Sequence, residues 1–227
     1  MSKLVVSSVN PEIVEGLKKE GFELIFSESL EILPEFERNH ADMQCLRINE
    51  TFFVLKECVS LRNRLSEEGL DVRITTDSIG GKYPENVLLN AVYYNSRLYC
   101  KESSVDKSVK EYCSENEIEI VNVNQGYAKC SVAVLNDGFI TADIGIFEAM
   151  NGRGERGLLI SPGNIELDGV DYGFIGGCCF ENNGLVYFSG DISKHPDYKR
   201  INEFLKGKEI VALTDKKLYD IGGFVAV

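Results

Sequence analysis

The chain has 227 residues, of which 44% are hydrophobic and 26% charged, and its formal net charge is −12. This length and composition suit a single globular domain over residues 1–227. The acidic charge disfavours nucleic acid, whose phosphates need Lys and Arg, and no apolar run approaches the roughly 20 residues that cross a membrane. Because the N-terminal MSKLVVSS is too polar for a signal peptide, we expect a cytoplasmic protein.

The first segment predicts a strand, a helix and a second strand. Residues 3–8 (KLVVSS) favour a strand, and Asn10-Pro11-Glu12 then supplies an N-cap, a proline in the first turn and an acidic residue, as helix starts prefer. The helix should end at Gly21, and residues 22–27 (FELIFS) favour another strand.

Four hairpins follow along the chain. Each has β-type residues around a turn containing Asn, Asp, Ser or Gly, and they cover residues 45–54, 91–100, 132–142 and 178–188. A helical pattern follows each hairpin, and then a strand over 71–76, 118–123, 157–162 or 209–214. The repeating unit is about 43–47 residues long, which marks an internal repeat.

The two chain ends complete the pattern. Residues 222–227 (GGFVAV) predict a strand without a hairpin partner, and the N-terminal KLVV is its natural neighbour. Pairing of these ends would close five units into a ring and hide the edge strands.

This arrangement resembles the pentein fold, also called the guanidino-group modifying enzyme fold, an α/β propeller of five blades. Arginine deiminase, agmatine deiminase and dimethylarginine hydrolase have this fold, as does a non-catalytic translation factor. The stretches HADMQ, GYAKCS, GFIGGCC and LTDKKLYDIGGFV are also similar to an uncharacterised bacterial family of that fold.

Polar residues should gather at one face of the ring. Right-handed crossovers make the first two strands of each unit parallel, so their carboxyl ends share a face with the starts of the antiparallel strands. The strand ends place Asp77, Asp143, Asp191 and Asp215 there, and the strand starts add His40, Asp42, Asn86, Lys129, Cys130 and Asp220. Gln44, beside Asp42, is a further candidate binding residue. Carboxylates at this face would suit a guanidinium, although each aspartate could instead cap a helix or loop.

A nucleophile is less clearly marked. The resemblance implies a cysteine near the end of the chain after a glycine run, but GGFVAV contains none. Cys130 and His40 are separated by the same two repeats as the cysteine and histidine of the deiminases, so Cys130 is the candidate nucleophile and His40 the candidate acid/base. Cys178 and Cys179 are a second option, with core packing as the alternative for all three.

Two functions remain open. One is an enzyme that acts on a guanidino or amidino small molecule, with Asp42, Gln44, Asn86, Lys129, Asp143, Asp215 and Asp220 as binding residues. The other is a non-catalytic pentein that binds a small cationic ligand or a protein partner. The sequence gives no argument for a metal or organic cofactor, and it does not indicate an oligomeric state.

Overall fold

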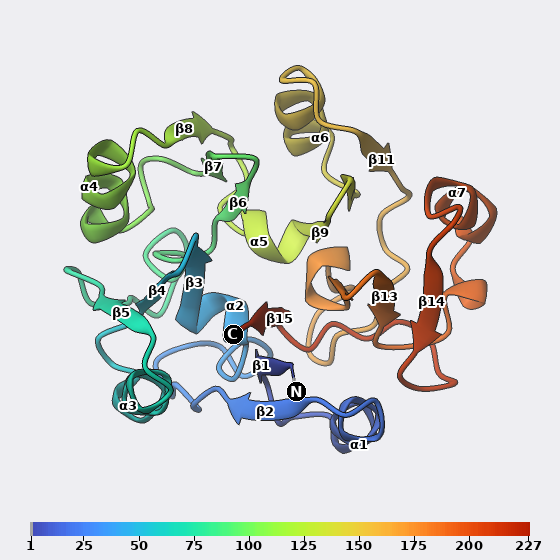
Figure 1. Ribbon diagram of the computed structural model, residues 1–227, viewed down its shortest axis with the longest axis horizontal. Helices are drawn as coiled ribbons and strands as arrows, with labels where there is room; N and C mark the ends of the chain where they lie inside the picture. Colours follow the sequence, from blue (N-terminus) through green and yellow to red (C-terminus); the bar gives the residue numbers. More distant parts are fainter. Residues whose placement is uncertain (1) are drawn as a thin grey trace.

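The chain folds into five three-stranded sheets, seen here in a computed structural model that describes residues 2–227. Figure 1 shows these sheets arranged around the middle of the molecule, with the longer helices at the periphery. In strand order the sheets are β15(Phe224–Ala226)-β1(Lys3–Val6)-β2(Glu23–Phe26), β3(Cys45–Ile48)-β4(Thr51–Val54)-β5(Asp71–Ile74), β6(Val92–Tyr94)-β7(Arg97–Cys100)-β8(Glu119–Asn122), β9(Val132–Leu135)-β10(Gly138–Thr141)-β11(Gly157–Leu159) and β12(Cys179–Asn182)-β13(Leu185–Phe188)-β14(Glu209–Ala212).

Each sheet follows the predicted repeat. Its central strand pairs in parallel with the strand beyond a helix and antiparallel with its hairpin partner, as in β3-β4-β5. The crossover helices are α1(Pro11–Lys19), α3(Val59–Glu67), α4(Lys107–Glu115), α6(Ile144–Asn151) and α7(Tyr198–Phe204). The expected pairing of the chain ends is also present, because β1 lies antiparallel to β15 with Val5 opposite Val225.

The segments before the antiparallel strands differ from our expectation. We predicted strand starts there, but the chain forms short helical turns at α2(Ala41–Gln44), α5(Ala128–Ser131) and η1(Ile175–Gly177). A further short turn, η2(Ile192–Lys194), precedes α7. These turns matter because successive helical residues point in different directions, whereas strand residues alternate between two faces.

Glycines allow the turns to pack closely. A Cβ atom on Gly176 would collide with the carbonyl oxygens of Lys129, Cys130 and Val132, so η1 can lie directly against α5. A Cβ atom on Gly177 would collide with the carboxylate of Asp220. The paired glycines therefore relieve crowding between these turns.

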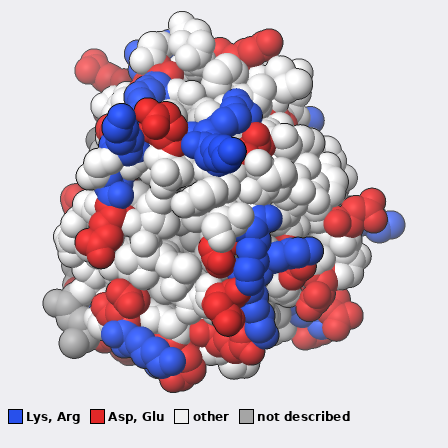
Figure 2. All heavy atoms as spheres, turned by 90° about the vertical axis from the view of Figure 1, so that its right-hand side faces the viewer, with Lys and Arg blue, Asp and Glu red and all other residues white. Residues whose placement is uncertain are grey.

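The surface carries both signs of charge. Figure 2, which shows the right-hand side of Figure 1, has Lys and Arg side chains beside Asp and Glu. Oppositely charged side chains also form ion pairs, as where Lys208 Nζ lies 2.7 Å from Asp137 and 2.6 Å from Glu181. The net negative charge is therefore not gathered into one acidic patch on this face. Among residues 2–227, no helix has the length and apolar character needed to cross a membrane.

We predict that Gly177→Ala lowers the free energy of unfolding by about 1–3 kcal/mol, because the added methyl group overpacks the site beside Asp220. Gly145→Ala is the matched control, since Gly145 lies in α6 and the nearest atom to its added Cβ would be 3.3 Å away. Alanine should stabilise that helix by about 0.5–1 kcal/mol. Urea unfolding measures both, and equal effects would contradict the packing account.

Candidate functional site

A cavity of about 290 Å³ contains several of the candidate residues, and we call it the His40 cavity. Its polar lining consists of Glu37, His40, Cys130, Asp171 and Asp220. Its apolar lining consists of Phe36, Tyr127, Leu167, Val170, Tyr172 and Phe174. Ionisable groups at an apolar cavity are the usual composition of a small-molecule site.

His40 sits at the start of α2 and is only 4% exposed. The backbone of Gly222 packs against its imidazole so closely that any side chain there would collide with the ring. Gly222 also has a φ of 79°, a conformation that favours glycine. The backbone N–H of Asp42 donates to the carbonyl of Gly222 at 2.9 Å, which fixes α2 against the C-terminal segment.

Asp42 is fully buried and does not itself line the His40 cavity. Neither carboxylate oxygen accepts a well-formed hydrogen bond within residues 2–227, and the neighbouring Cys130 thiol is its one weak contact of this kind. An unpartnered buried polar group destabilises a protein by about 1–3 kcal/mol, and a charged one by more. Asp106 shows the ordinary alternative. Its carboxylate accepts hydrogen bonds from the backbone N–H groups of Thr76, Asp77 and Ser108, which outweigh burial and lower its pKa.

Asp220 is also buried, at 1% exposure, but its oxygens are used. One accepts from the backbone N–H of Phe174 and the other from that of Gly222, both at 2.8 Å. Burial raises the pKa of Asp220, the positive charge of His40 opposes this effect, and the negative charge of Asp42 adds to it. Asp220 therefore connects the cavity wall to two loops and holds its proton more tightly than an exposed aspartate does.

Cys130 lies in α5, 3% exposed, and is held by Asn90. The Asn90 side-chain Nδ2 donates to Cys130 Sγ at 3.0 Å and to the backbone carbonyl of Asp42 at 3.2 Å. Its Oδ1 accepts from the backbone N–H of Lys129 at 2.8 Å. Burial raises the pKa of the Cys130 thiol well above its usual value, Asp42 and Asp220 add to this, and the Asn90 hydrogen bond opposes it. The resting thiol is therefore neutral.

A hydrogen-bonded chain forms another part of the cavity wall. Asn86 Nδ2 donates to Glu37 Oε1 and to the hydroxyl oxygen of Tyr127, each at 2.7 Å. Burial is the main cause that raises the pKa of Glu37, and it raises the pKa of Tyr127 to about 12. Asn86 thus supports the site from behind the lining residues.

Other candidates lie elsewhere, contrary to our prediction. The Gln44 amide bonds to the backbone of Glu28 and Arg38, so it holds the preceding loop. Asp215 is in an exposed turn, where its carbonyl accepts from Lys194. Neither lines the His40 cavity, because the turn of α2 directs Gln44 away and β14 ends at Ala212.

The remaining candidates do not line the His40 cavity. Asp143 caps α6 by accepting from the N–H of Ile146 at 2.9 Å, and it lines a different cavity. Lys129 does not line the His40 cavity. Cys178 and Cys179 are buried at 0% and 2% exposure and are also outside it, as expected for core residues.

Sequence reasoning missed Glu37, Asn90 and Tyr127. Asn90 had a visible signal, because it is a polar residue within the apolar run VLLNAVYY. Glu37 had none, since the surrounding PEFER resembles an exposed loop. The structure thus brings His40, Asp42, Cys130 and Asp220 together from segments far apart in the sequence.

A model of a family of unknown function, DUF6873, matches residues 4–225, so the chain belongs to that family. No curated protein matches the sequence. The structure is similar to dimethylarginine dimethylaminohydrolase, a pentein, in an adduct with 4-chloro-2-hydroxymethylpyridine, with a TM-score of 0.58, 9% identity, and coverage of 99% of both chains.

Two other structures of this hydrolase are also similar. A cysteine-to-serine mutant from Pseudomonas aeruginosa, complexed with citrulline, has a TM-score of 0.56, 10% identity, and coverage of 98% of this chain and 95% of the other. A histidine-to-glycine form, an adduct with S-methyl-L-thiocitrulline, has a TM-score of 0.55, 9% identity, and coverage of 98% and 96%. These similarities show a mixed α/β fold of the pentein kind.

Asp42→Asn should leave the free energy of unfolding unchanged or raise it, because it removes an uncompensated buried charge. Asp106→Asn, the matched buried control, should lower it by about 1–3 kcal/mol, because one carboxylate acceptor becomes an amide donor facing backbone N–H groups. Urea unfolding at neutral pH compares them. Equal destabilisation by both would show that Asp42 has stabilising partners after all.

Asp220 should also affect the pH dependence of stability. Its pKa in the folded protein is raised above the ordinary value of 3.8. The contribution of Asp220 to the free energy of unfolding is therefore full below pH 3.8 and is lost as the pH rises through the raised pKa. The Asp220→Asn variant should therefore gain stability relative to the wild type as pH rises from about 4 to 7.

Urea titrations across this pH range measure the trend. Asp191→Asn is the control with the opposite sign, because hydrogen bonds from Ser193 lower the pKa of Asp191. The Asp191→Asn variant should therefore lose relative stability as pH rises. A pH-independent difference for Asp220→Asn would contradict the raised pKa.

Proposed function

We propose that this member of the DUF6873 family binds a guanidino or amidino small molecule in the His40 cavity and hydrolyses it with Cys130 as nucleophile. The observation that carries the proposal is the carboxylate of Asp42, which is buried without a hydrogen-bond donor beside Cys130 and Asp220, the two residues that present this charge to the cavity. A guanidinium or amidinium ion bound at Asp220 and Cys130 supplies N–H donors to the cavity and a positive charge close to the Asp42 carboxylate. The likeness to a guanidino-modifying hydrolase supports this at the level of the fold.

The bound cation would also activate the thiol. Asp42 and Asp220 contribute to the raised pKa of Cys130 in the free protein. A positive charge placed beside these carboxylates offsets their effect, and the thiol pKa then falls. The nucleophile is thus formed when the ligand is bound, and the free thiol stays unreactive.

The reaction then proceeds in two balanced stages. His40, in its neutral form, accepts the thiol proton, and the Cys130 thiolate forms a bond to the central guanidinium carbon. The carbon–nitrogen bond to the leaving amine breaks as His40 returns a proton to that nitrogen. Water adds to the thiouronium carbon as His40 takes one of its protons, and the carbon–sulfur bond then breaks to release a urea or ureido product. The remaining hydroxyl proton leaves to solvent, and His40 returns its proton to the thiolate, which restores the neutral thiol.

The rest of the chain has supporting roles in this proposal. Asn90 positions Cys130 and stabilises its thiolate through the 3.0 Å bond to Sγ. Asp220 and Glu37 line the cavity as acceptors for the cation. Residues 1–227 would form one cytoplasmic domain with its five sheets closed into a ring, as the pairing of β1 with β15 supports.

A second function has its own support. The neutral, deeply buried thiol of Cys130 is the state expected for a packing residue, so a ring that binds a small cation without reaction is the alternative. Both functions use the same carboxylates. They differ only in whether the bound cation makes Cys130 reactive.

We predict that chloroacetamidine, an amidinium-bearing alkylating agent, labels Cys130 faster in the folded protein than in the unfolded chain. Iodoacetamide, which has no charge, should show no such preference. His40→Ala should slow the amidine reaction by about 10²–10⁴-fold, and Asp42→Asn should remove its advantage over iodoacetamide. Mass spectrometry of the labelled peptides measures each rate.

Cys130→Ser should abolish the fast labelling, and Cys179→Ser, which replaces a similarly buried thiol, should not. If no cysteine reacts faster than in the unfolded chain, Cys130 is not a nucleophile. If amidines nevertheless stabilise the folded protein against unfolding in the same samples, the protein binds a cation without reacting with it.

A further inference from the structure

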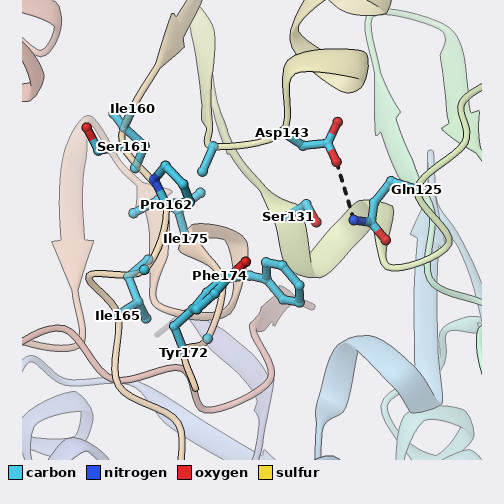
Figure 3. Close-up of a pocket in the computed structure, with 13 residues that line it drawn as sticks. Gln125, Ser131, Asp143, Ile160, Ser161, Pro162, Ile165, Tyr172, Phe174 and Ile175 are labelled. Atoms are coloured by element: carbon cyan, nitrogen blue, oxygen red, sulfur yellow. Dashed lines mark hydrogen bonds between the residues drawn. The ribbon is translucent and has the colours of Figure 1, made fainter. Parts of the chain in front are cut away.

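A second cavity, of about 120 Å³, has a polar side and an apolar side. Figure 3 shows Gln125, Ser131 and Asp143 together on one side, with Ile160, Ile165 and Tyr172 across from them. Its volume is smaller than that of the His40 cavity, so it suits the terminal group of a ligand better than a complete one.

The polar side has unused hydrogen-bonding capacity. Ser131 is 2% exposed, and its hydroxyl has no hydrogen-bond partner within residues 2–227. Gln125 Nε2 donates to Asp143 Oδ2 at a long 3.3 Å, and the other Asp143 oxygen caps α6. Asp143 forms no ion pair with any Lys or Arg of the described chain. A buried free hydroxyl beside an uncompensated carboxylate favours a ligand that is cationic and donates hydrogen bonds.

This cavity adjoins the proposed reaction site. Ser131 directly follows Cys130 in α5, so one short helix contributes to both cavities. Tyr172 and Phe174 line both as well, which makes their rings a common wall. No Lys or Arg lines either cavity, so both favour positive charge.

We propose that the Ser131 cavity is a subsite for a terminal primary ammonium group of the same ligand. This inference rests on the proposed function of the His40 cavity and narrows its substrate class to guanidines that carry a second cation. The guanidinium lies at Asp220 and Cys130, an alkyl spacer packs on Tyr172 and Phe174, and the ammonium group donates to Asp143 and Ser131. Aromatic rings also attract cations, which further suits this wall.

The alternative is a ligand whose far end carries a carboxylate instead of an ammonium group. A neighbouring cavity that shares Phe36 and His40 with the His40 cavity contains Arg38, which could accept a carboxylate. Arg38 is already paired with Glu31, at 3.1 Å between Nη1 and Oε2. The unpaired Asp143 therefore favours an ammonium end over a carboxylate end.

Three guanidines with the same carbon chain separate these cases: butylguanidine, aminobutylguanidine and guanidinobutanoate. Isothermal titration calorimetry of the wild-type protein should show that aminobutylguanidine binds about ten-fold more tightly than butylguanidine, as one charge-assisted hydrogen bond provides. Guanidinobutanoate should bind no better than butylguanidine. Cys130→Ser protein can be used to prevent turnover during the titrations.

Asp143→Asn tests the residue itself, because Asn is an equally good helix cap but carries no charge. This variant should lose the preference for the amine and keep the affinity for butylguanidine. Ser131→Ala should reduce the preference in part. Asp191→Asn, a capping aspartate outside both cavities, is the control and should change neither value.

Three results would overturn the subsite while leaving the guanidinium site intact. The first is equal binding of aminobutylguanidine and butylguanidine, and the second is a preference for guanidinobutanoate that Arg38→Gln removes. The third is a preference for aminobutylguanidine that survives in Asp143→Asn. If the wild type binds none of the three compounds, the proposed function itself fails and the subsite fails with it. The two failures are therefore distinguishable.

Discussion

The buried carboxylate of Asp42, which lacks any hydrogen-bond donor within the described chain, is the constraint around which the site is organised. Its charge influences the titration of Cys130 and Asp220, which come from two other segments, and of Glu37 in the preceding loop. A fold that only needed stability would have given this group partners, as it does for Asp106. Unfavourable charge of this kind is typical of positions where function opposes stability.

The repeated architecture explains how the groups meet. The segments that precede β3, β6, β9 and β15 each contribute polar side chains: His40 and Asp42, Asn86 and Asn90, Cys130, and Asp220. The segment before β12 contributes glycines instead, and their missing side chains make room for Asp220 and α5. Equivalent positions thus carry different side chains, so the repeated fold provides the geometry and individual residues decide the chemistry of the site.

Local patterns allowed much of the fold to be predicted from the sequence. Turn residues such as Asn49 and Asn95, which adopt positive φ, identified the hairpins, and the count of strands identified the partner of the last one. The site was harder to predict, because the segments expected to be strand starts are short helical turns. These turns direct Gln44 toward a loop and leave Cys130 facing the cavity. Asn90 and Glu37 act through contacts over 40 and 49 residues of sequence, which no local pattern encodes.

The central claim is that a cation completes this carboxylate cluster, and proton release on binding tests it most directly. Calorimetry with butylguanidine at several pH values between about 4 and 8, in buffers of different ionisation enthalpy, counts the protons exchanged. Because Asp220 and Cys130 have raised pKa values, a bound cation should lower them, and the protein should release protons into the buffer. Binding without proton exchange, or no binding, would contradict the claim.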